Sequence, residues 1–148
     1  MDDPGEPDEP IAVDLRAYAV FDATVAAGRR VFTTDVVAVD LVCLEPQQVM
    51  GARTLEADAV YTVIGGRVWV VTDEAEITLE PLQAILLPAG VTHGLRNASP
   101  DPLILHAVYS PPQDAPPASA GPAAANQGMA APLAPPRFLE RVRRVLGS

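Results

Sequence analysis

The stretch that decides the fold is LQAILLPAGVTHGLRN, residues 82–97. Its first half, residues 82–87, is an almost unbroken apolar run, which predicts a buried strand. Pro88-Ala89-Gly90 ends this strand, because proline lacks an N–H for the ladder and glycine tolerates the positive φ of a sharp turn. Residues 93–97 alternate again and predict a second strand, so His93 should stand at the mouth of whatever the sheet encloses.

The spacing Pro88-x-Gly90-x-x-His93-x-x-x-Asn97 resembles the second motif of the cupin superfamily. Leu82 stands where that family has the leading glycine of the motif. Upstream, Glu45-Pro46 and the segment YTVIGG, residues 61–66, resemble the frame of the first cupin motif. Residues 103–109, followed by Ser110-Pro111-Pro112, resemble the last core strand and its exit. The resemblance covers residues 18–112 and implies a double-sheet jelly roll.

The resemblance also implies a metal site, to which the first motif gives two histidines and a glutamate and the second motif one histidine. In this chain the first three positions hold Arg53, Leu55 and Ala59, and only His93 remains. A first-row metal site needs three or four protein donors, so one neutral imidazole does not suffice. We therefore expect a cupin-like binding or scaffold domain with a degenerate metal site and no cofactor, and we lean against an enzyme.

A second hypothesis, from a different functional class, is a metal-dependent isomerase or dioxygenase. It would combine His93 with non-standard ligands such as His106, Glu56 or Asp58. Asp58 would need a shift of one residue in strand register to point inward. For His106, in the last strand, a structural role is favoured.

His93, Arg53, Tyr61 and Asn97 are the candidates for a ligand pocket. His93 is either a site residue or a satisfied core histidine, and the sequence leaves both open. The guanidinium of Arg53 would replace a metal by a fixed positive charge and could bind a carboxylate or phosphate with two hydrogen bonds, unless it turns to solvent. Tyr61 has the parity of Ala59 and should face inward, as a hydroxyl donor or simply as a core aromatic residue.

Length, charge and composition exclude several other classes of function. With 148 residues, one domain is expected, and a net charge of −9 argues against nucleic-acid binding. The single cysteine, Cys43, excludes an internal disulfide framework and should be a small core residue. No apolar run approaches the ~20 residues of a membrane span, and the acidic N-terminus lacks the features of a secretory signal. We expect a cytoplasmic protein.

Short strands separated by turn signals predict an all-β sandwich or barrel, and the resemblance selects the jelly roll. For residues 11–27 the sequence allows either a short strand or a helical turn. Gly28-Arg29-Arg30 is expected to end this element. Gly65-Gly66 predicts a tight hairpin between two paired strands. The expected strands are one or two over residues 31–44, then 60–64, 67–72, 76–79, 82–87, 93–97 and 103–109.

The ends of the chain differ from the barrel in composition. We expect an acidic disordered tail over residues 1–10, the barrel over 11–112, a Pro/Ala-rich linker over 113–136 and a basic amphipathic segment over 137–148. Helical spacing would align the apolar residues of the last segment, which makes it a candidate docking element for a protein partner; a membrane surface is less favoured. The docking residues are Phe138, Arg141, Val142, Val145 and Leu146.

Trp69 is a candidate for a dimer interface. If its neighbours Val68 and Val70 face the core, Trp69 points outward on the same strand. The resemblance supports a homodimer, since cupin-like domains commonly dimerise through such faces. The alternative is that the N-terminal segment covers Trp69.

Overall fold

The computed structural model describes residues 9–114. The acidic tail up to residue 8, the linker from residue 115 on and the candidate docking segment lie outside this range. Within it, no helix is long and apolar enough to span a membrane. The elements are η1 Leu15–Tyr18, β1 Ala27–Thr33, β2 Ala38–Leu44, β3 Val49–Arg53, β4 Asp58–Gly65, β5 Val68–Thr72, β6 Glu76–Leu79, β7 Ala84–Leu87, β8 His93–Arg96 and β9 Leu103–Ser110.

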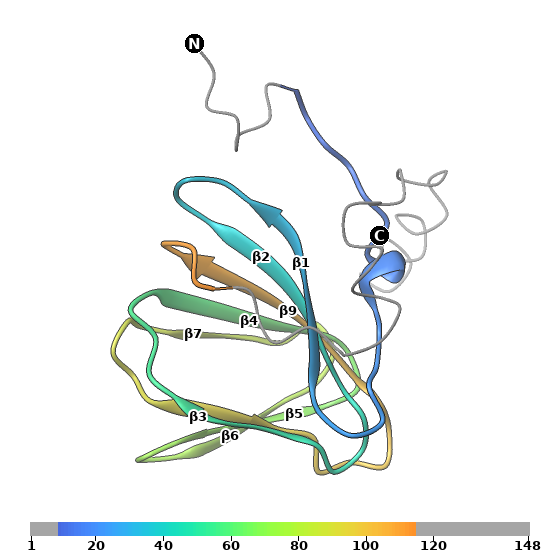
Figure 1. The fold of residues 1–148 in the computed structure, drawn as a ribbon. Coiled ribbons are helices and arrows are strands. Elements are labelled where there is room, and N and C mark those ends of the chain that lie inside the picture. Colours follow the sequence, from blue (N-terminus) through green and yellow to red (C-terminus); the bar gives the residue numbers. More distant parts are fainter. Residues whose placement is uncertain (1–8, 115–148) are drawn as a thin grey trace.

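The strands form two antiparallel sheets that face each other (Figure 1). One sheet has the order β1-β2-β9-β4-β7 and the other the order β3-β8-β5-β6. Most connections pass from one sheet to the other, as in a jelly roll. The predicted all-β, double-sheet jelly-roll architecture is confirmed.

The core lies between the two sheets because one face of each strand is apolar. In β4 the side chains of Ala59, Tyr61 and Val63 point inward and are fully buried, as their common parity predicts. Val68 and Val70 of β5 meet them from the opposite sheet. Each large aliphatic side chain buried in this way contributes about 1.5–3 kcal/mol of stability.

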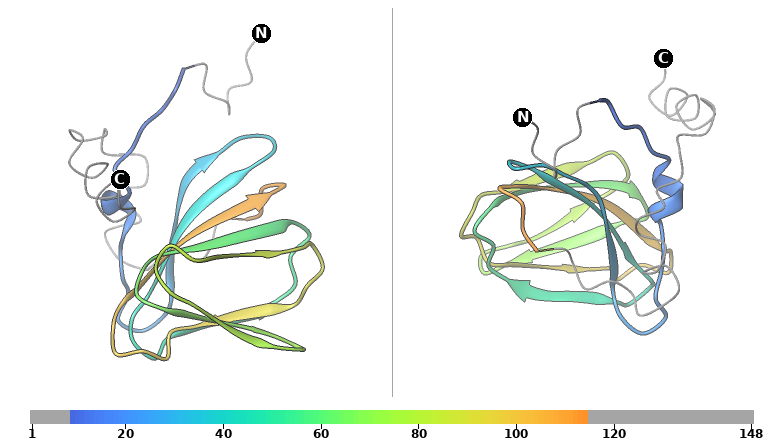
Figure 2. Two further views of the ribbon diagram at one scale, coloured as in Figure 1. Left: turned by 180° about the vertical axis from the view of Figure 1, so that it is seen from behind. Right: turned by 45° about the horizontal axis from the view of Figure 1, so that its top comes forward.

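A second, smaller core lies on the outer side of the five-stranded sheet. Tyr18 at the end of η1 packs with Leu41 and Cys43 of β2, and Figure 2 shows η1 outside the sandwich on the β1 side. Asp14 caps η1 by accepting a hydrogen bond from the backbone of Arg16 at 2.9 Å. Burial raises the pKa of the Cys43 thiol to about 12, so Cys43 is the inert core residue that its apolar surroundings predict.

One predicted boundary near the N-terminus needs correction. Gly28-Arg29-Arg30 does not end an element but lies inside β1, where Arg30 pairs in register with Asp40 of β2. Of the one or two strands predicted over residues 31–44, the structure has two, β1 and β2, because the chain reverses after Thr33. The Thr34 hydroxyl holds this turn by accepting hydrogen bonds from the backbone of Val36 and Val37.

The predicted hairpin at Gly65-Gly66 is wrong. β4 pairs with β7 and β9, whereas β5 pairs with β6 and β8, so the chain crosses from one sheet to the other at these glycines. Gly66 has φ +85°, and a Cβ at that position would lie 2.3 Å from the carbonyl oxygen of Pro102. The glycine is therefore required by a close approach to the β8–β9 connection rather than by a hairpin.

The run over residues 82–87 is also less buried than predicted. β7 lies at the end of its sheet away from β1 and η1, and only its inward-facing residues pack against the core. Leu87 is buried, while Leu86 is 60% exposed and Leu82 is 47% exposed. A continuous apolar run at a sheet edge thus presents one face to the core and leaves the other face uncovered.

Replacing Leu82 by glycine should not reduce stability and should raise it by up to about 1 kcal/mol. Leu82 has φ +68°, which costs a residue with a Cβ about 1–2 kcal/mol, whereas glycine adds about 0.5–1 kcal/mol of unfolded-state entropy. Urea denaturation would compare Leu82→Gly with Leu86→Gly, an exposed leucine in a regular strand. A loss of stability in Leu82→Gly as large as in Leu86→Gly would contradict this account.

Candidate functional site: a polar cluster at one end of the barrel

Four polar side chains meet inside the barrel at one end of it: Arg53, Tyr61, His93 and Tyr109, called the barrel cluster below. Arg53 ends β3 and His93 begins β8, and the two residues pair in register across the four-stranded sheet. Tyr61 lies in β4 and Tyr109 near the end of β9, on adjacent strands of the other sheet. The inner parity of each strand brings these residues together from both sheets.

His93 is only 2% exposed, and both of its ring nitrogens have partners. Nδ1 lies 3.0 Å from the carbonyl oxygen of Val91, which can only accept, so Nδ1 carries the proton. Nε2 is then the acceptor, and the Tyr61 hydroxyl donates to it over 2.7 Å. Burial lowers the pKa of His93, and the nearby Arg53 charge lowers it further, so the imidazole is neutral at pH 7.

Arg53 is the positive charge of the barrel cluster. Its Nη2 donates to the hydroxyl of Tyr109 over 3.1 Å, and its guanidinium carbon lies 5.9 Å from the centre of the Tyr109 ring. Burial is the main cause that raises the pKa of Tyr109, which therefore keeps its proton. The side chain of Arg53 is half-buried, so it turns into the barrel without losing contact with solvent.

A buried ion pair borders the barrel cluster. Asp40 of β2 is fully buried, and it accepts hydrogen bonds from Nε and Nη2 of Arg30 over 2.8 and 3.2 Å. Asp40 stands in register with Ala107 of β9, which in turn stands opposite Tyr61. Because Arg30 compensates Asp40, this pair adds no net charge to the barrel.

The comparison with known proteins decides the family. A family model described as "Cupin domain" matches residues 40–109, the stretch from the middle of β2 to the end of β9. Crystal structures with this fold include TT1209 from Thermus thermophilus, which is 35% identical with a TM-score of 0.63 and matches 66% of this chain and 94% of its own. The chain belongs to the cupin superfamily.

Other cupin-fold structures are more distant. BH2720 from Bacillus halodurans is 26% identical with a TM-score of 0.61, over 76% of this chain and 87% of its own. A double-stranded β-helix protein from Klebsiella pneumoniae is 20% identical with a TM-score of 0.65, over 70% and 91% of the two chains. The comparison with curated proteins gave no significant match.

The four cupin ligand positions do not supply a cupin donor set in this chain. Leu55 and Ala59 are buried in the apolar core, and Arg53 lies beside His93, so one neutral imidazole stands next to a cation. Three or four nitrogen, oxygen or sulfur donors are needed for a first-row metal, and a guanidinium is not one of them. Among residues 9–114, His, Cys, Asp and Glu side chains nowhere gather in a group of three that could hold a metal ion. The residues present do not fit the cupin metal.

The alternative metal ligands do not come together with His93. Glu56 and Asp58 are exposed, and the Asp58 carboxylate accepts a hydrogen bond from the backbone of Ala89 over 2.9 Å. His106 lies on the outer face of β9, in register with Leu41 and Thr62, whereas the barrel cluster lies on the inner face. The ligand set of the metal-enzyme hypothesis is therefore not assembled.

Asn97, predicted as a ligand-pocket candidate, is not part of the barrel cluster. Its side-chain nitrogen donates to the carbonyl oxygens of Leu44 and Asp101, and its side-chain oxygen accepts from Ser99. It is fully buried and joins the end of β2 to the β8–β9 connection. With its donors and its acceptor satisfied by the protein itself, the motif's asparagine is a structural residue here.

Trp69 points outward from β5, as its parity predicts, and two arginines cover its ring. The guanidinium carbons of Arg67 and Arg96 lie 5.9 and 6.0 Å from the ring centre. Each arginine also pairs with a glutamate, Arg67 with Glu80 and Arg96 with Glu76. These arginines leave Trp69 half-buried.

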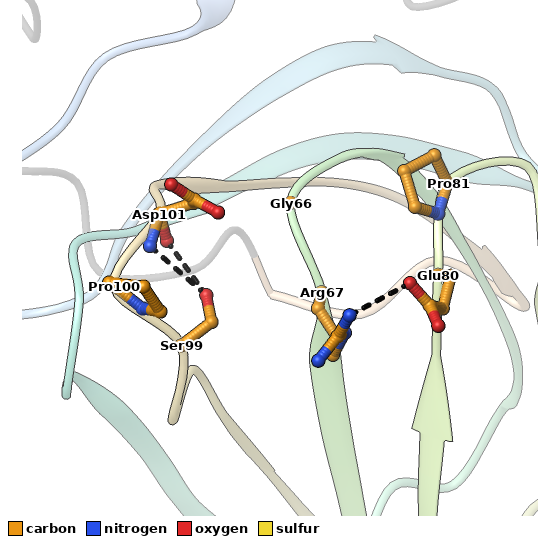
Figure 3. Close-up of a pocket in the computed structure, with 7 residues that line it drawn as sticks. All are labelled: Gly66, Arg67, Glu80, Pro81, Ser99, Pro100 and Asp101. Carbon is orange, nitrogen blue, oxygen red and sulfur yellow. Dashed lines mark hydrogen bonds and ion pairs between the residues drawn. The ribbon is translucent and has the colours of Figure 1, made fainter.

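A separate hollow of about 420 Å³ lies at the opposite end of the barrel (Figure 3). Arg67 and Glu80 form an ion pair on one side of it, and on the other side Ser99 is hydrogen-bonded within its own loop. These polar groups satisfy one another, so the hollow does not share the chemistry of the barrel cluster. Its lining residues are Gly66, Arg67, Glu80, Pro81, Ser99, Pro100 and Asp101.

The sequence interpretation missed two features of the site. Tyr109 has the parity of Leu105 and Ala107 in β9, and this signal alone would have placed its ring in the barrel. The Arg30–Asp40 pair gave no such signal, because an acid in an alternating strand is normally assigned to the solvent face.

The barrel should lose stability as the pH falls below about 6.5. Burial lowers the native pKa values of His93 and His106 below the ordinary 6.5, so below that pH the unfolded chain binds more protons than the folded one. For each unit by which a native pKa is lowered, the free energy of unfolding falls by about 1.4 kcal/mol once the pH is below both pKa values. The chain has two histidines, so a His93→Gln, His106→Gln double variant removes this contribution. Urea denaturation at pH 7.5 and 5.5 should show a smaller pH dependence in the double variant, and an equal dependence would contradict the assignment.

Proposed function

We propose that this cupin is a non-enzymatic, metal-free binding domain in which the Arg53 guanidinium takes the place of the cupin metal ion. One observation carries the proposal. A permanent cation lies at a ligand position, opposite the one retained histidine, and it is hydrogen-bonded to Tyr109 inside the barrel. A guanidinium keeps its charge at any physiological pH and needs no further protein donors, so it can attract an anionic ligand as a metal ion would.

Metal analysis tests this proposal. Protein purified without chelators should contain far less than one Fe, Mn, Ni or Zn ion per chain, and His93→Ala should leave that content unchanged. A stoichiometric, tightly held metal ion that disappears in His93→Ala would show that a metal site built on His93 survives, and would support the enzyme hypothesis instead.

We further propose that the barrel is a passenger or sensor recruited through residues 137–148. The support is compositional: four apolar residues at helical spacing and several arginines follow a proline-rich linker long enough, at ~3.1 Å per residue, to reach tens of ångströms. The segment is basic while the chain as a whole is acidic, so its attraction to a partner should be local and salt-dependent. A cupin barrel with this fold is also a part of an XRE family transcriptional regulator from Enterobacter cloacae.

A fusion experiment tests recruitment. Residues 111–148 joined to a fluorescent protein should reproduce the localisation and the captured partners of the whole chain. The same fusion with Phe138→Asp and Val142→Asp is the control that should lose them. If the intact fusion stays diffuse and captures nothing while the isolated barrel retains the partners, the recruitment proposal is wrong.

A homodimer through the outer face of the four-stranded sheet is the third part of the proposal. Trp69, Arg67 and Arg96 with their two glutamates form a patch of alternating charge around an aromatic centre, which is suited to pairing with its own copy. Light scattering at tens of micromolar should give a dimer that Trp69→Asp dissociates. Leu86→Asp, on the outer face of the other sheet, is the matched control and should remain dimeric. A wild-type monomer would contradict the proposal, and dissociation by Leu86→Asp alone would move the interface to the other sheet.

A further inference from the structure

We propose that the barrel cluster binds a small organic monocarboxylate with a short apolar body. This inference rests on the proposed function and specifies its ligand. It depends on the net charge, the hydrogen-bonding groups and the surroundings of Arg53.

The barrel cluster carries one uncompensated positive charge. Within residues 9–114 the ion pairs join Arg16 to Asp14, Arg30 to Asp40, Arg67 to Glu80 and Arg96 to Glu76, and Arg53 takes part in none of them. Its neighbours His93 and Tyr109 are neutral, since burial and the Arg53 charge lower the pKa of His93 and burial raises the pKa of Tyr109. An unpaired cation that is partly removed from water is costly, and one negative charge would compensate it.

The hydrogen-bonding groups around Arg53 are mainly donors. A guanidinium has five N–H donors in a planar fork, and one bond to Tyr109 leaves enough of them to hold both oxygens of a carboxylate. Tyr109 accepts that bond from Arg53, so its own hydroxyl proton can be donated. A carboxylate offers acceptors only and is planar, so it matches this arrangement in charge and in shape.

The residues beside Arg53 argue against a ligand with more charge. The other two former ligand positions hold Leu55 and Ala59, both buried in the apolar core, so no further cation faces the ligand from there. Arg30 is the other cation bordering the cluster, and its charge is already compensated by the buried Asp40, so it is not free for a second negative charge. Apolar neighbours fit a hydrocarbon body, whereas a dicarboxylate or a phosphate dianion would bring a charge that nothing on this wall compensates.

Butyrate is a suitable probe, with succinate and inorganic phosphate as the competing anions. Titrations of the full chain at pH 7.5 and constant chloride, followed by backbone ¹⁵N–¹H shifts, should give saturable changes at Arg53, His93 and Tyr109 with butyrate. Arg53→Gln should weaken butyrate binding at least tenfold, because a charge-assisted hydrogen-bonded pair is lost. Arg16→Gln, which removes an exposed arginine outside the barrel, should leave butyrate binding unchanged.

Tyr109→Phe provides a second variant, because it leaves the Arg53 charge in place and should weaken butyrate binding severalfold even if Arg53→Gln fails to fold. Absence of saturable shifts with butyrate, tighter binding of phosphate or succinate, or equal weakening by Arg16→Gln would overturn the inference. These outcomes differ from failure of the proposed function, which the metal content reports: a metal-free chain that ignores butyrate refutes the ligand only, whereas a stoichiometric metal ion refutes the proposed function itself.

Discussion

Gly66→Ala should lower the free energy of unfolding by about 2–5 kcal/mol. The φ of +85° costs a residue with a Cβ about 1–2 kcal/mol, and the new methyl group would lie 2.3 Å from the Pro102 carbonyl oxygen and 2.9 Å from the Leu103 Cα. Both contacts are with backbone, so relief requires the β8–β9 connection to move, which adds about 1–3 kcal/mol as for other overpacked sites.

Gly65→Ala is the matched control for this prediction. A Cβ on Gly65 meets nothing within 4 Å, and its φ is not in the positive range, so its stability should change by less than about 1 kcal/mol. Urea denaturation of the two variants measures the difference directly. Equal stabilities would show that the chain crosses between the sheets here without the close approach to Pro102.

Asp40→Ala should destabilise the barrel by about 3–5 kcal/mol. The Asp40 carboxylate is fully buried and accepts two hydrogen bonds from Arg30, whose side chain is 22% exposed. Removal of one partner of a buried pair leaves the other charge uncompensated in a medium of low dielectric, which is the main cost.

The exposed pair between Arg96 and Glu76 is the comparison for Asp40. Its side chains are 41% and 47% exposed, so Glu76→Ala should cost at most about 1 kcal/mol, and that cost should shrink in high salt. The loss in Asp40→Ala should persist in 1 M NaCl because the pair is shielded from counterions. A loss below about 1 kcal/mol, or one that salt removes, would place Asp40 in contact with solvent and contradict its position inside the barrel.

The sequence predicts those parts of the fold that depend on local alternation and on motif spacing. The parity of β4 placed Tyr61 inside the barrel, and the spacing between Gly90 and His93 placed the imidazole at the start of β8. These predictions held because side-chain direction in a strand is set by its own backbone, whichever strand it pairs with. The residues at the four cupin ligand positions could be identified by counting along the two motifs.

Features that depend on long-range pairing were predicted less well. Gly65-Gly66 gives the same signal for a hairpin and for a crossing between sheets, and only the pairing of β4 with β9 distinguishes them. The apolar run in β7 looks the same at the edge of a sheet as at its centre, although an edge strand has one uncovered side. Asn97 was assigned to the pocket because it belongs to the motif, but its amide is held by backbone carbonyls that only the folded chain brings near.

The candidate site also combines features that the local sequence predicts with features that depend on long-range pairing. Arg53 could be named from the sequence, but its partner Tyr109 is 56 residues away, and their contact depends on the register between strands of opposite sheets. Asp40 gave no sequence signal at all, since its burial follows from Arg30 on the neighbouring strand. Polar groups inside a barrel are therefore recognised from paired strands rather than from any one strand.

In the proposed function, this barrel keeps the cupin frame while a guanidinium stands where the metal would bind. A calorimetric titration with Ni²⁺ tests it most directly, on the wild-type chain and on the triple variant Arg53→His, Leu55→His, Ala59→Glu, which restores the cupin ligands beside His93. We expect no specific Ni²⁺ uptake by the wild type, and one ion per chain in the triple variant that is lost when His93→Ala is added. One ion per wild-type chain, lost in His93→Ala, or no uptake by a folded triple variant, would contradict it.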